Sequence, residues 1–283
     1  MKTPYFARLA AAALSLALLG GCGGTQSTGA EDAQTAPAEL TVFAAASMTE
    51  TLNEIAEDYK SVDPNVTLTF NFASSGDLLT QIKEGADCDV FISAAPKQMN
   101  ALDGTLKDDP DKNPDGLDEL LDGTRLDLLE NKVTLAVPEG NPKDIKSFDD
   151  LAEKLKSGSV FLAIGNSDVP VGQYTQKIFA YYQLDEKALA AAGLLTYGSN
   201  VKEVTTQVSE GAVDCGIIYA TDAFSAGLTA VDEATAEQCG RVIYPAAVLK
   251  NSAHAEAAKE FLAYLTTDEA SKVFESVGFT ALS

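Results

Sequence analysis

The chain has 283 residues, of which 46% are hydrophobic, and its net charge is −22. The hydrophobic share is that of an ordinary globular protein. The acidic charge argues against nucleic acid and anionic lipid headgroups as partners, because both require basic patches.

The first 22 residues have the pattern of an export signal. Lys2 and Arg8 give a short positive start, and the apolar run 9–19 is shorter than the about 20 residues that span a bilayer. The tetrapeptide Leu19-Gly20-Gly21-Cys22 resembles a bacterial lipobox, whose cysteine is acylated and becomes the mature N-terminus. We predict a lipoprotein signal peptide over 1–22, lipidation at Cys22, and an extracytoplasmic protein lipid-anchored to the cell membrane. An ordinary secretory signal and a membrane-anchoring helix are the alternatives.

Residues 23–38 hold no large apolar side chain and are rich in Gly, Ser, Thr and Ala. Such a segment cannot bury enough surface to offset the entropy of ordering it, so we predict a flexible tether. About 245 residues remain, 39–283, which is enough for two modest cores.

The start of this body alternates between strands and helices. The apolar run 40–46, the alternating run 66–72 and the short run 90–92 predict three strands. Apolar residues within 52–59 and 78–82 recur with helical spacing between them. This βαβαβ order is typical of a parallel sheet covered by helices.

The segment 103–123 breaks this pattern. It is dense in Asp and Glu and has little periodicity, so it predicts an acidic surface insertion. The run 109–116 invites a calcium-loop interpretation, but the required sixth-position Gly would be Pro114 and the twelfth-position Glu would be Leu120. A solvated acidic loop is the better interpretation.

Alternation resumes after this segment. Asn200 and Glu203 have the spacing of a capping box at one of the predicted helix starts. The predicted strands are 132–138, 160–164, 194–197, 216–219 and 241–249, and the predicted helices are 173–183, 201–210, 253–266 and 268–276.

Two sets of βα units joined through strand-like segments near 132–138 and 241–248 indicate two lobes with two chain crossings. Such a layout places a cleft between the lobes, where the C-terminal ends of strands face each other. We place the first lobe at 39–132 and 245–283, and the second at 133–244.

Apart from Cys22, the sequence has Cys88, Cys215 and Cys239, and one histidine, His254. A structural zinc site needs four soft ligands at close spacing, which this pattern lacks, so we expect no metal cation. In an oxidising compartment one disulfide is expected, and Cys215–Cys239 is our first choice among the three pairs. His254, at a predicted helix start, is expected on the surface.

The strand-to-helix junctions carry the informative residues. Ser47 and Ser75 lie at two junctions of the first lobe, and Val171 and Val201 at two of the second. Each junction presents unpaired backbone N–H groups and the positive end of a helix dipole, so several converging on one cleft form an anion site without a cationic side chain. For each serine alone, helix capping competes. For Tyr219, at the end of a strand, the competing interpretation is a core residue with a hydrated hydroxyl.

Several segments resemble the molybdate-binding proteins of ABC importers, and the resemblance spans residues 39–283 in order. The segments are Phe43-Ala44-Ala45-Ala46-Ser47, Ala73-Ser74-Ser75-Gly76, Asp89-Val90-Phe91-Ile92-Ser93-Ala94, Val169-Pro170-Val171-Gly172-Gln173-Tyr174, Gly216-Ile217-Ile218-Tyr219, Tyr244-Pro245-Ala246-Ala247-Val248 and Val277-Gly278-Phe279. The resemblance implies an α/β protein with the class II periplasmic-binding-protein fold, in which two α/β lobes with a hinge close over a tetrahedral oxyanion in the interlobe cleft.

In that family two serines, two backbone amides and a tyrosine hydroxyl hold the anion. They match Ser47 and Ser75, Val171 and Val201, and Tyr219. At 171 a larger aliphatic residue replaces a frequently small one, which leaves the amide donor in place. The resemblance implies capture of molybdate or tungstate and delivery to the transmembrane subunits of an ABC importer. It implies no catalytic residue and no cofactor, since the metal is bound as its oxyanion, and we expect a monomer.

A site made only of donors suits a fully deprotonated dianion, because the O–H of a protonated oxyanion finds no acceptor there. This disfavours phosphate, whereas sulfate must be excluded by size, so a receptor for sulfate or another tetrahedral oxyanion is the alternative. Two other classes compete. One is an enzyme using Ser47 or Ser75, for which the sequence has no G-x-S-x-G motif. The other is a surface lipoprotein acting through the acidic insertion.

Overall fold

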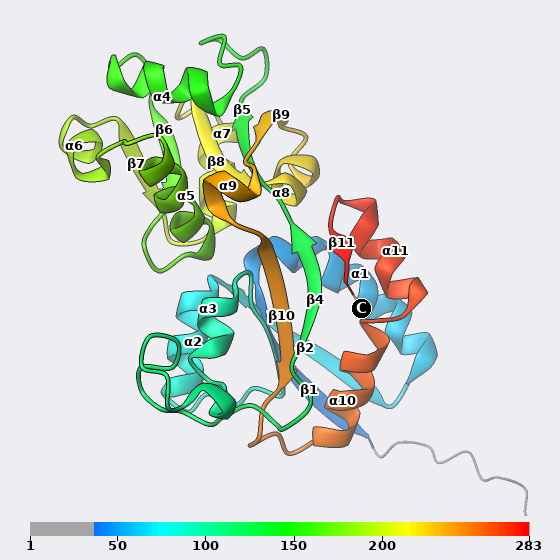
Figure 1. The fold of residues 1–283 in the computed structure, drawn as a ribbon. Coiled ribbons are helices and arrows are strands. Elements are labelled where there is room, and N and C mark those ends of the chain that lie inside the picture. Colours follow the sequence, from blue (N-terminus) through cyan, green and yellow to red (C-terminus); the bar gives the residue numbers. More distant parts are fainter. Residues whose placement is uncertain (1–36, 283) are drawn as a thin grey trace, which may run out of the picture. The chain divides into compact units, whose positions relative to one another are not determined.

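Two mixed β-sheets, each with its own helices, make up residues 37–282, which are the residues that the computed structural model describes (Figure 1). The first sheet has six strands in the order β11-β4-β10-β3-β1-β2, and the second has five in the order β7-β6-β8-β5-β9. We call each sheet with its helices a lobe, the first lobe holding the six-stranded sheet. The predicted signal peptide, the lipobox with Cys22 and the tether as far as residue 36 lie outside the described residues.

The first lobe opens with the predicted βαβαβ order. β1 pairs in parallel with β2 and β3, while β10 runs antiparallel to β3 and β4, and β11 pairs with β4 at one edge. Its elements are β1 (Ala38–Ala45), the short 3-10 helix η1 (Ala46–Met48), α1 (Thr49–Val62), β2 (Val66–Ala73), α2 (Ser75–Lys83), β3 (Val90–Ile92), α3 (Pro96–Asn100), η2 (Gly104–Leu106), β4 (Leu126–Asn131), β10 (Val242–Val248), α10 (Ala255–Tyr264), α11 (Asp268–Ser276) and β11 (Thr280–Ala281).

In the second lobe, β6 lies between β7 and β8 and is parallel to both, and β5 is antiparallel to β8 and β9. The helix predicted from residue 173 begins at Pro170, because the first helical position tolerates the missing N–H of proline. The lobe's elements are β5 (Val133–Val137), α4 (Phe148–Lys156), β6 (Leu162–Gly165), α5 (Pro170–Tyr181), α6 (Glu186–Ala191), β7 (Leu195–Gly198), α7 (Val201–Ser209), β8 (Cys215–Tyr219), α8 (Ala220–Ser225), β9 (Thr229–Glu233) and α9 (Ala236–Cys239).

The chain crosses between the sheets twice. It passes from β4 to β5 through Lys132 and returns between α9 and β10 (Figure 1). The boundary predicted after residue 132 coincides with the first crossing. The one predicted between 244 and 245 lies inside β10, whose residues 242–244 already pair with β4 of the first sheet.

Several elements are missing from the prediction: β4, β9 and α4, and the short elements α3, α6, α8, α9 and β11. β4 carries two acidic residues among its leucines, so its sequence resembles that of the acidic segment before it. β9 is partly exposed and has little apolar periodicity. α4 carries a local signal, since the side chain of its N-cap Ser147 accepts the amide of Asp150 and two acidic residues occupy its first turn.

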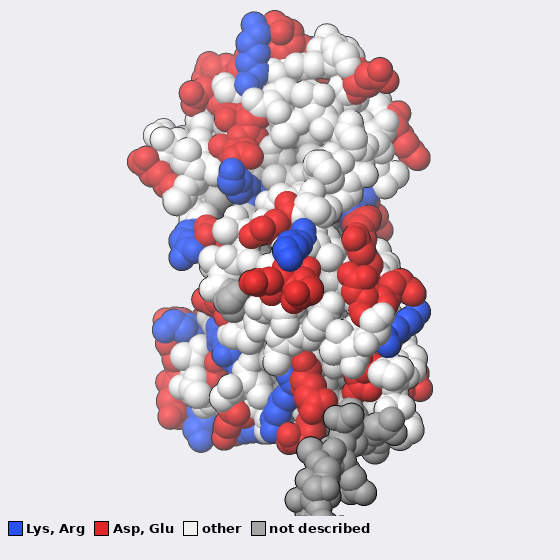
Figure 2. Space-filling view, turned by 90° about the vertical axis from the view of Figure 1, so that its right-hand side faces the viewer, with Lys and Arg blue, Asp and Glu red and all other residues white. Residues whose placement is uncertain are grey.

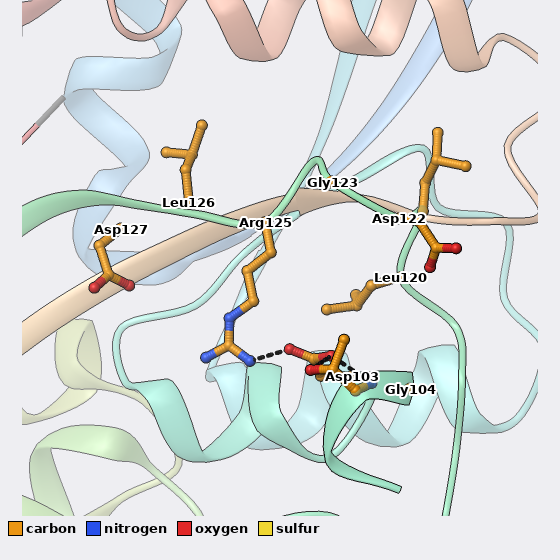
Figure 3. Close-up of a pocket in the computed structure, with 10 residues that line it drawn as sticks. Asp103, Gly104, Leu120, Asp122, Gly123, Arg125, Leu126 and Asp127 are labelled. Carbon is orange, nitrogen blue, oxygen red and sulfur yellow. Dashed lines mark hydrogen bonds and ion pairs between the residues drawn. The ribbon is translucent and has the colours of Figure 1, made fainter.

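The acidic segment 103–123 lies mostly at the surface, as predicted, but Asp103, Asn113 and Leu120 are buried and anchor it to the first lobe. Figure 3 shows Arg125 directed at Asp103, with which it forms an ion pair. Burial opposes ionisation of Asp103, but hydrogen bonds from Thr105 and Arg125 outweigh it and lower the pKa of this carboxyl. The buried Asn113 side chain bonds the backbone of Asp103 and Leu117. Leu120 packs in a hydrophobic cluster with Phe91 and Leu249 among others.

Most of the remaining acidic residues lie at the surface. Figure 2 shows Asp and Glu side chains spread over one face, with single Lys and Arg side chains among them. Pairs such as Lys60–Glu57 and Arg241–Glu130 are largely exposed, so they add little to stability. Within residues 37–282 the buried carboxyl groups are Asp63, Asp89, Asp103 and Asp222.

One expectation about side chains is wrong, and one is confirmed. Cys88, Cys215 and Cys239 are all free and buried, so the predicted Cys215–Cys239 disulfide is absent. Cys215 instead lies near the carbonyl group of Phe161, and Cys239 near that of Thr235. His254 is exposed at the start of α10, as predicted.

No helix within residues 37–282 is long and apolar enough to cross a membrane.

Candidate functional site

A small cavity of about 10 Å³ lies where helix N-termini of the two lobes meet. Pockets for organic ligands are typically about 300–1,000 Å³, so this space suits one small ion. All five predicted site residues, Ser47, Ser75, Val171, Val201 and Tyr219, line it. The other lining residues are Ala45, Ala46, Ala73, Ser74, Ala94, Val169 and Pro170.

Ser47 reaches the cavity from η1, directly after β1. Its side chain is 4% exposed and caps no helix, which removes the capping interpretation. Ser47 Oγ lies 2.9 Å from Tyr244 Oη on β10. Tyr244 is fully buried, and its hydroxyl also accepts a hydrogen bond from Asn131 Nδ2 at 3.2 Å.

Ser75 is the first residue of α2. The residue that caps this helix is its neighbour Ser74, whose Oγ accepts the amide N–H of Asp77 at 3.1 Å. Ser75 is fully buried, and its Oγ accepts the amide N–H of Ala94 at 3.0 Å. Because that bond uses the Ser75 oxygen as an acceptor, its O–H proton remains available to the cavity.

The second lobe contributes the N-termini of α5 and α7. Val171 is the second residue of α5 and Val201 the first of α7, so their amide groups have no carbonyl partner within the helix. Asn200 caps α7 through the amide of Glu203, as predicted. The other half of the predicted capping box is wrong, because the Glu203 carboxylate accepts the amide of Ser199 instead.

Tyr219 ends β8 with its hydroxyl in the cavity. The side chain is 1% exposed, and its Oη has no hydrogen-bond partner among the described residues. Its ring packs edge-on against Tyr174 and Tyr244, with centroids 6.4 and 5.8 Å apart. Burial raises the pKa of Tyr219 well above 10, so the phenol is a neutral donor. A buried unpaired hydroxyl costs about 1–3 kcal/mol, which is a reason to expect that a ligand satisfies it.

Comparison with known proteins shows the family to which the chain belongs. The family model described as bacterial extracellular solute-binding protein matches residues 40–280. The chain belongs to this family.

Relatives of this solute-binding protein are similar over nearly its whole length. A Bacillus subtilis chain named as a candidate ABC transporter substrate-binding lipoprotein, YvgL, is 35% identical and covers 96% of both chains. The molybdate-binding protein ModA of Haemophilus influenzae is 33% identical over 87% of this chain and 91% of its own. The periplasmic molybdate-binding protein of Azotobacter vinelandii superposes with a TM-score of 0.71 at 20% identity, covering 86% of this chain and all of that one. The predicted periplasmic-binding-protein fold is thereby confirmed.

The two lobes of this solute-binding protein touch beside the cavity. Gly76, the second residue of α2, faces the carbonyl group of Asp168, which precedes α5. A Cβ atom at Gly76 would lie 2.3 Å from that carbonyl oxygen, closer than real Cβ contacts come. Because this glycine has an ordinary helical φ, its small size and not its backbone freedom is what the contact requires.

A second contact between the lobes involves residues that the sequence did not reveal. Lys202 on α7 lies 2.7 Å from Glu50 in the first turn of α1, and 3.1 Å from Asp222 on α8. Asp222 is fully buried, and burial, partly offset by Lys202, raises its pKa to about 6. These residues are far apart in sequence and carry no motif, so only the fold brings them together.

Proposed function

We propose that this solute-binding protein captures molybdate, and tungstate with it, as a fully ionised dianion in the interlobe cavity, and delivers it to the transmembrane subunits of an ABC importer. The set of groups that line the cavity supports this proposal. Ser47, Ser75, Tyr219 and the amides of Val171 and Val201 can all donate. Within residues 37–282, no Asp, Glu, Lys, Arg or His lines the space.

A donor-only site selects by protonation state. A dianion with four unprotonated oxygens accepts every bond offered, whereas an oxyanion that carries a proton brings an O–H for which the lining offers no free acceptor. Helix N-termini add partial positive charge at short range, which explains how a chain of net charge −22 can hold a dianion. The names of the Haemophilus and Azotobacter relatives point to molybdate within this class.

Calorimetric titration of the purified protein with molybdate, tungstate, sulfate and phosphate tests this function. We expect tight binding of the first two, weaker binding of sulfate and the weakest binding of phosphate. Sulfate shares the charge and shape of molybdate, so a receptor for sulfate is the second candidate, and a preference for sulfate would establish it. Preference for phosphate, or no response to any oxyanion, would contradict the site.

We also propose that residues 1–22 are a lipoprotein signal peptide and that Cys22 anchors the protein to the outside of the cell membrane through the tether 23–38. The lipobox pattern and the lipoprotein name of the Bacillus relative support this. Metabolic labelling with a fatty acid should tag the wild type and leave Cys22→Ala unlabelled. A Cys22→Ala variant that still takes up the label would contradict lipid anchoring at Cys22.

The rival functions meet physical objections. A hydrolase using Ser47 or Ser75 needs a base within hydrogen-bond reach, and the single histidine, His254, is exposed at the start of α10 and outside the cavity lining.

An adhesive role for the acidic segment 103–123 is tested by substitution and not by deletion, because a deletion would remove the buried Leu120. Neutralising the exposed Asp108, Asp111 and Asp122 to Asn should leave oxyanion affinity unchanged, whereas a role in capture requires a loss.

A further inference from the structure

A chain of buried side-chain hydrogen bonds runs from the crossing between the lobes to the cavity. Asn131, the last residue of β4, donates from Nδ2 to Thr221 Oγ1 at 2.9 Å and to Tyr244 Oη at 3.2 Å. Tyr244 Oη lies 2.9 Å from Ser47 Oγ, which lines the cavity. All four side chains are at most 4% exposed, so water does not compete for these bonds.

The protons in this chain have a defined direction. Asn131 Oδ1 accepts the amide N–H of Lys132 at 2.8 Å, which fixes the orientation of the side-chain amide and leaves Nδ2 on the side of Tyr244. Since Nδ2 can only donate, Tyr244 Oη accepts there, and its own proton is directed to Ser47 Oγ. Ser47 therefore accepts from Tyr244, and its own proton points to the cavity.

The opposite direction leaves a group unpaired. If Ser47 donated to Tyr244, the phenol proton would have no acceptor with hydrogen-bond geometry, because Asn131 and Ser47 are the partners within bonding distance of this hydroxyl. The hydroxyl of Tyr219, whose ring packs on Tyr244, makes no such bond among the described residues. An unsatisfied buried donor is unfavourable. Ser75 is likewise held as a donor toward the cavity, because its oxygen accepts a hydrogen bond from the amide of Ala94, which can only donate.

We propose that Tyr244, oriented by Asn131, is a specificity-determining positioning residue that holds Ser47 as a proton donor toward the ligand. This inference rests on the proposed oxyanion site. Its consequence is that each cavity serine directs its proton at the ligand and already has one oxygen lone pair occupied, which disfavours monoprotonated oxyanions even when their size fits. Specificity for the ionised form is thus set from outside the cavity lining.

The test replaces Tyr244 with Phe, which removes the hydroxyl and keeps the ring. Affinities for molybdate, sulfate and phosphate are measured at one pH near 7.5, phosphate by competition against molybdate. Loss of the bond that orients Ser47 should weaken molybdate and sulfate alike, by about fivefold, since one neutral hydrogen bond is worth about that factor. Phosphate, which can now donate to Ser47, should bind as well as or better than in the wild type. Tyr59→Phe, which alters a buried first-lobe tyrosine packed on Phe261 and Tyr264, is the matched control.

The same change made in a Ser47→Ala background separates positioning from general damage. With no hydroxyl to orient, Tyr244→Phe should leave the phosphate-to-molybdate affinity ratio where Ser47→Ala sets it. An equal loss for all three anions, weaker phosphate binding in Tyr244→Phe than in the wild type, or an undiminished effect without Ser47 would each overturn the proposal. If the wild type binds neither molybdate nor sulfate, the proposed function fails instead.

Discussion

The two sides of the cavity are built from different chemistry. The first lobe presents the side-chain hydroxyls of Ser47 and Ser75, each next to a group that uses its oxygen as an acceptor. The second lobe presents backbone amides at Val171 and Val201, whose side chains are aliphatic, together with the unpaired hydroxyl of Tyr219. Recognition thus depends on residue identity on one side and mostly on helix geometry on the other. Substitutions should therefore have unequal effects on the two sides.

The largest losses of affinity are expected where a side-chain hydroxyl is removed from the cavity. Ser75→Ala and Ser47→Ala each remove one donor to a charged ligand, which should cost roughly 1.5–3 kcal/mol, or about 10–150-fold in Kd for molybdate. Calorimetric titration measures this directly. Binding unchanged in both variants would place the site elsewhere.

Tyr219→Phe should produce a similar loss of affinity, roughly 1.5–3 kcal/mol, for the same reason. Its effect on folding should differ from that of the serines. The Tyr219 hydroxyl has no partner among the described residues, so removing it should leave the free energy of unfolding of the ligand-free protein unchanged or raised. Removing Ser75 Oγ leaves the buried amide of Ala94 unpaired and should lower the free energy of unfolding. Chemical denaturation of both variants distinguishes the two.

Gly76→Ala tests the contact between the lobes. The added Cβ collides with the Asp168 carbonyl, so the lobes should not close fully and molybdate should bind about tenfold more weakly. The same change should stabilise α2 by up to about 1 kcal/mol, because Ala is the better helix former. Thr80→Ala, on the exposed side of the same helix, is the control expected to keep full affinity. If Gly76→Ala binds normally, closure does not require this approach.

Asp222→Asn should change how stability depends on pH. The folded-state pKa of Asp222, about 6, lies above its ordinary value of 3.8, so the folded protein holds this proton between the two values and the unfolded chain does not. The wild type should therefore lose stability relative to Asp222→Asn as pH rises from about 4 to about 6. Urea denaturation of both proteins across this range measures the difference. A difference that is constant with pH would show that Asp222 titrates normally.

The smallest effect on affinity is expected at Val171. Val171→Ala keeps the backbone amide, so molybdate affinity should change by less than about twofold, although the lost buried methyl groups should lower the unfolding free energy by about 1–2 kcal/mol. A loss comparable to that of Ser75→Ala would mean that the valine side chain itself shapes the site. The comparison between the two sides of the cavity would then not hold.

Much of this architecture follows from local sequence patterns. The first three strands, the helices after them and the junction residues are each specified within a few neighbouring positions, by periodicity and by the residues that begin a helix. The five candidate site residues each stand where a strand ends or a helix opens, and the family resemblance selected them among the residues of these junctions. What brings them together is the topology, which the family resemblance implied and the periodicity alone did not.

The features that were missed depend on distant partners. Asn131 and Tyr244 are 113 positions apart, and Lys202 and Glu50 are 152 apart, so no spacing rule connects them. Ser74 and Ser75 are adjacent and chemically identical, and the sequence does not show which one caps α2 and which one faces the cavity. The wrong disulfide has the same origin, since the predicted export signal implies an oxidising compartment but not which thiols meet.

The three free thiols give the protein a property unrelated to its ligand. Cys88, Cys215 and Cys239 are buried, and burial raises the pKa of each, so they are protonated and shielded while the chain is folded. Residues 37–282 therefore reach their native structure without oxidative cross-linking, and export would not make folding depend on a thiol oxidase. A maleimide reagent added to the native protein should label these positions only as fast as the core opens, so the labelling rate would report how often it opens.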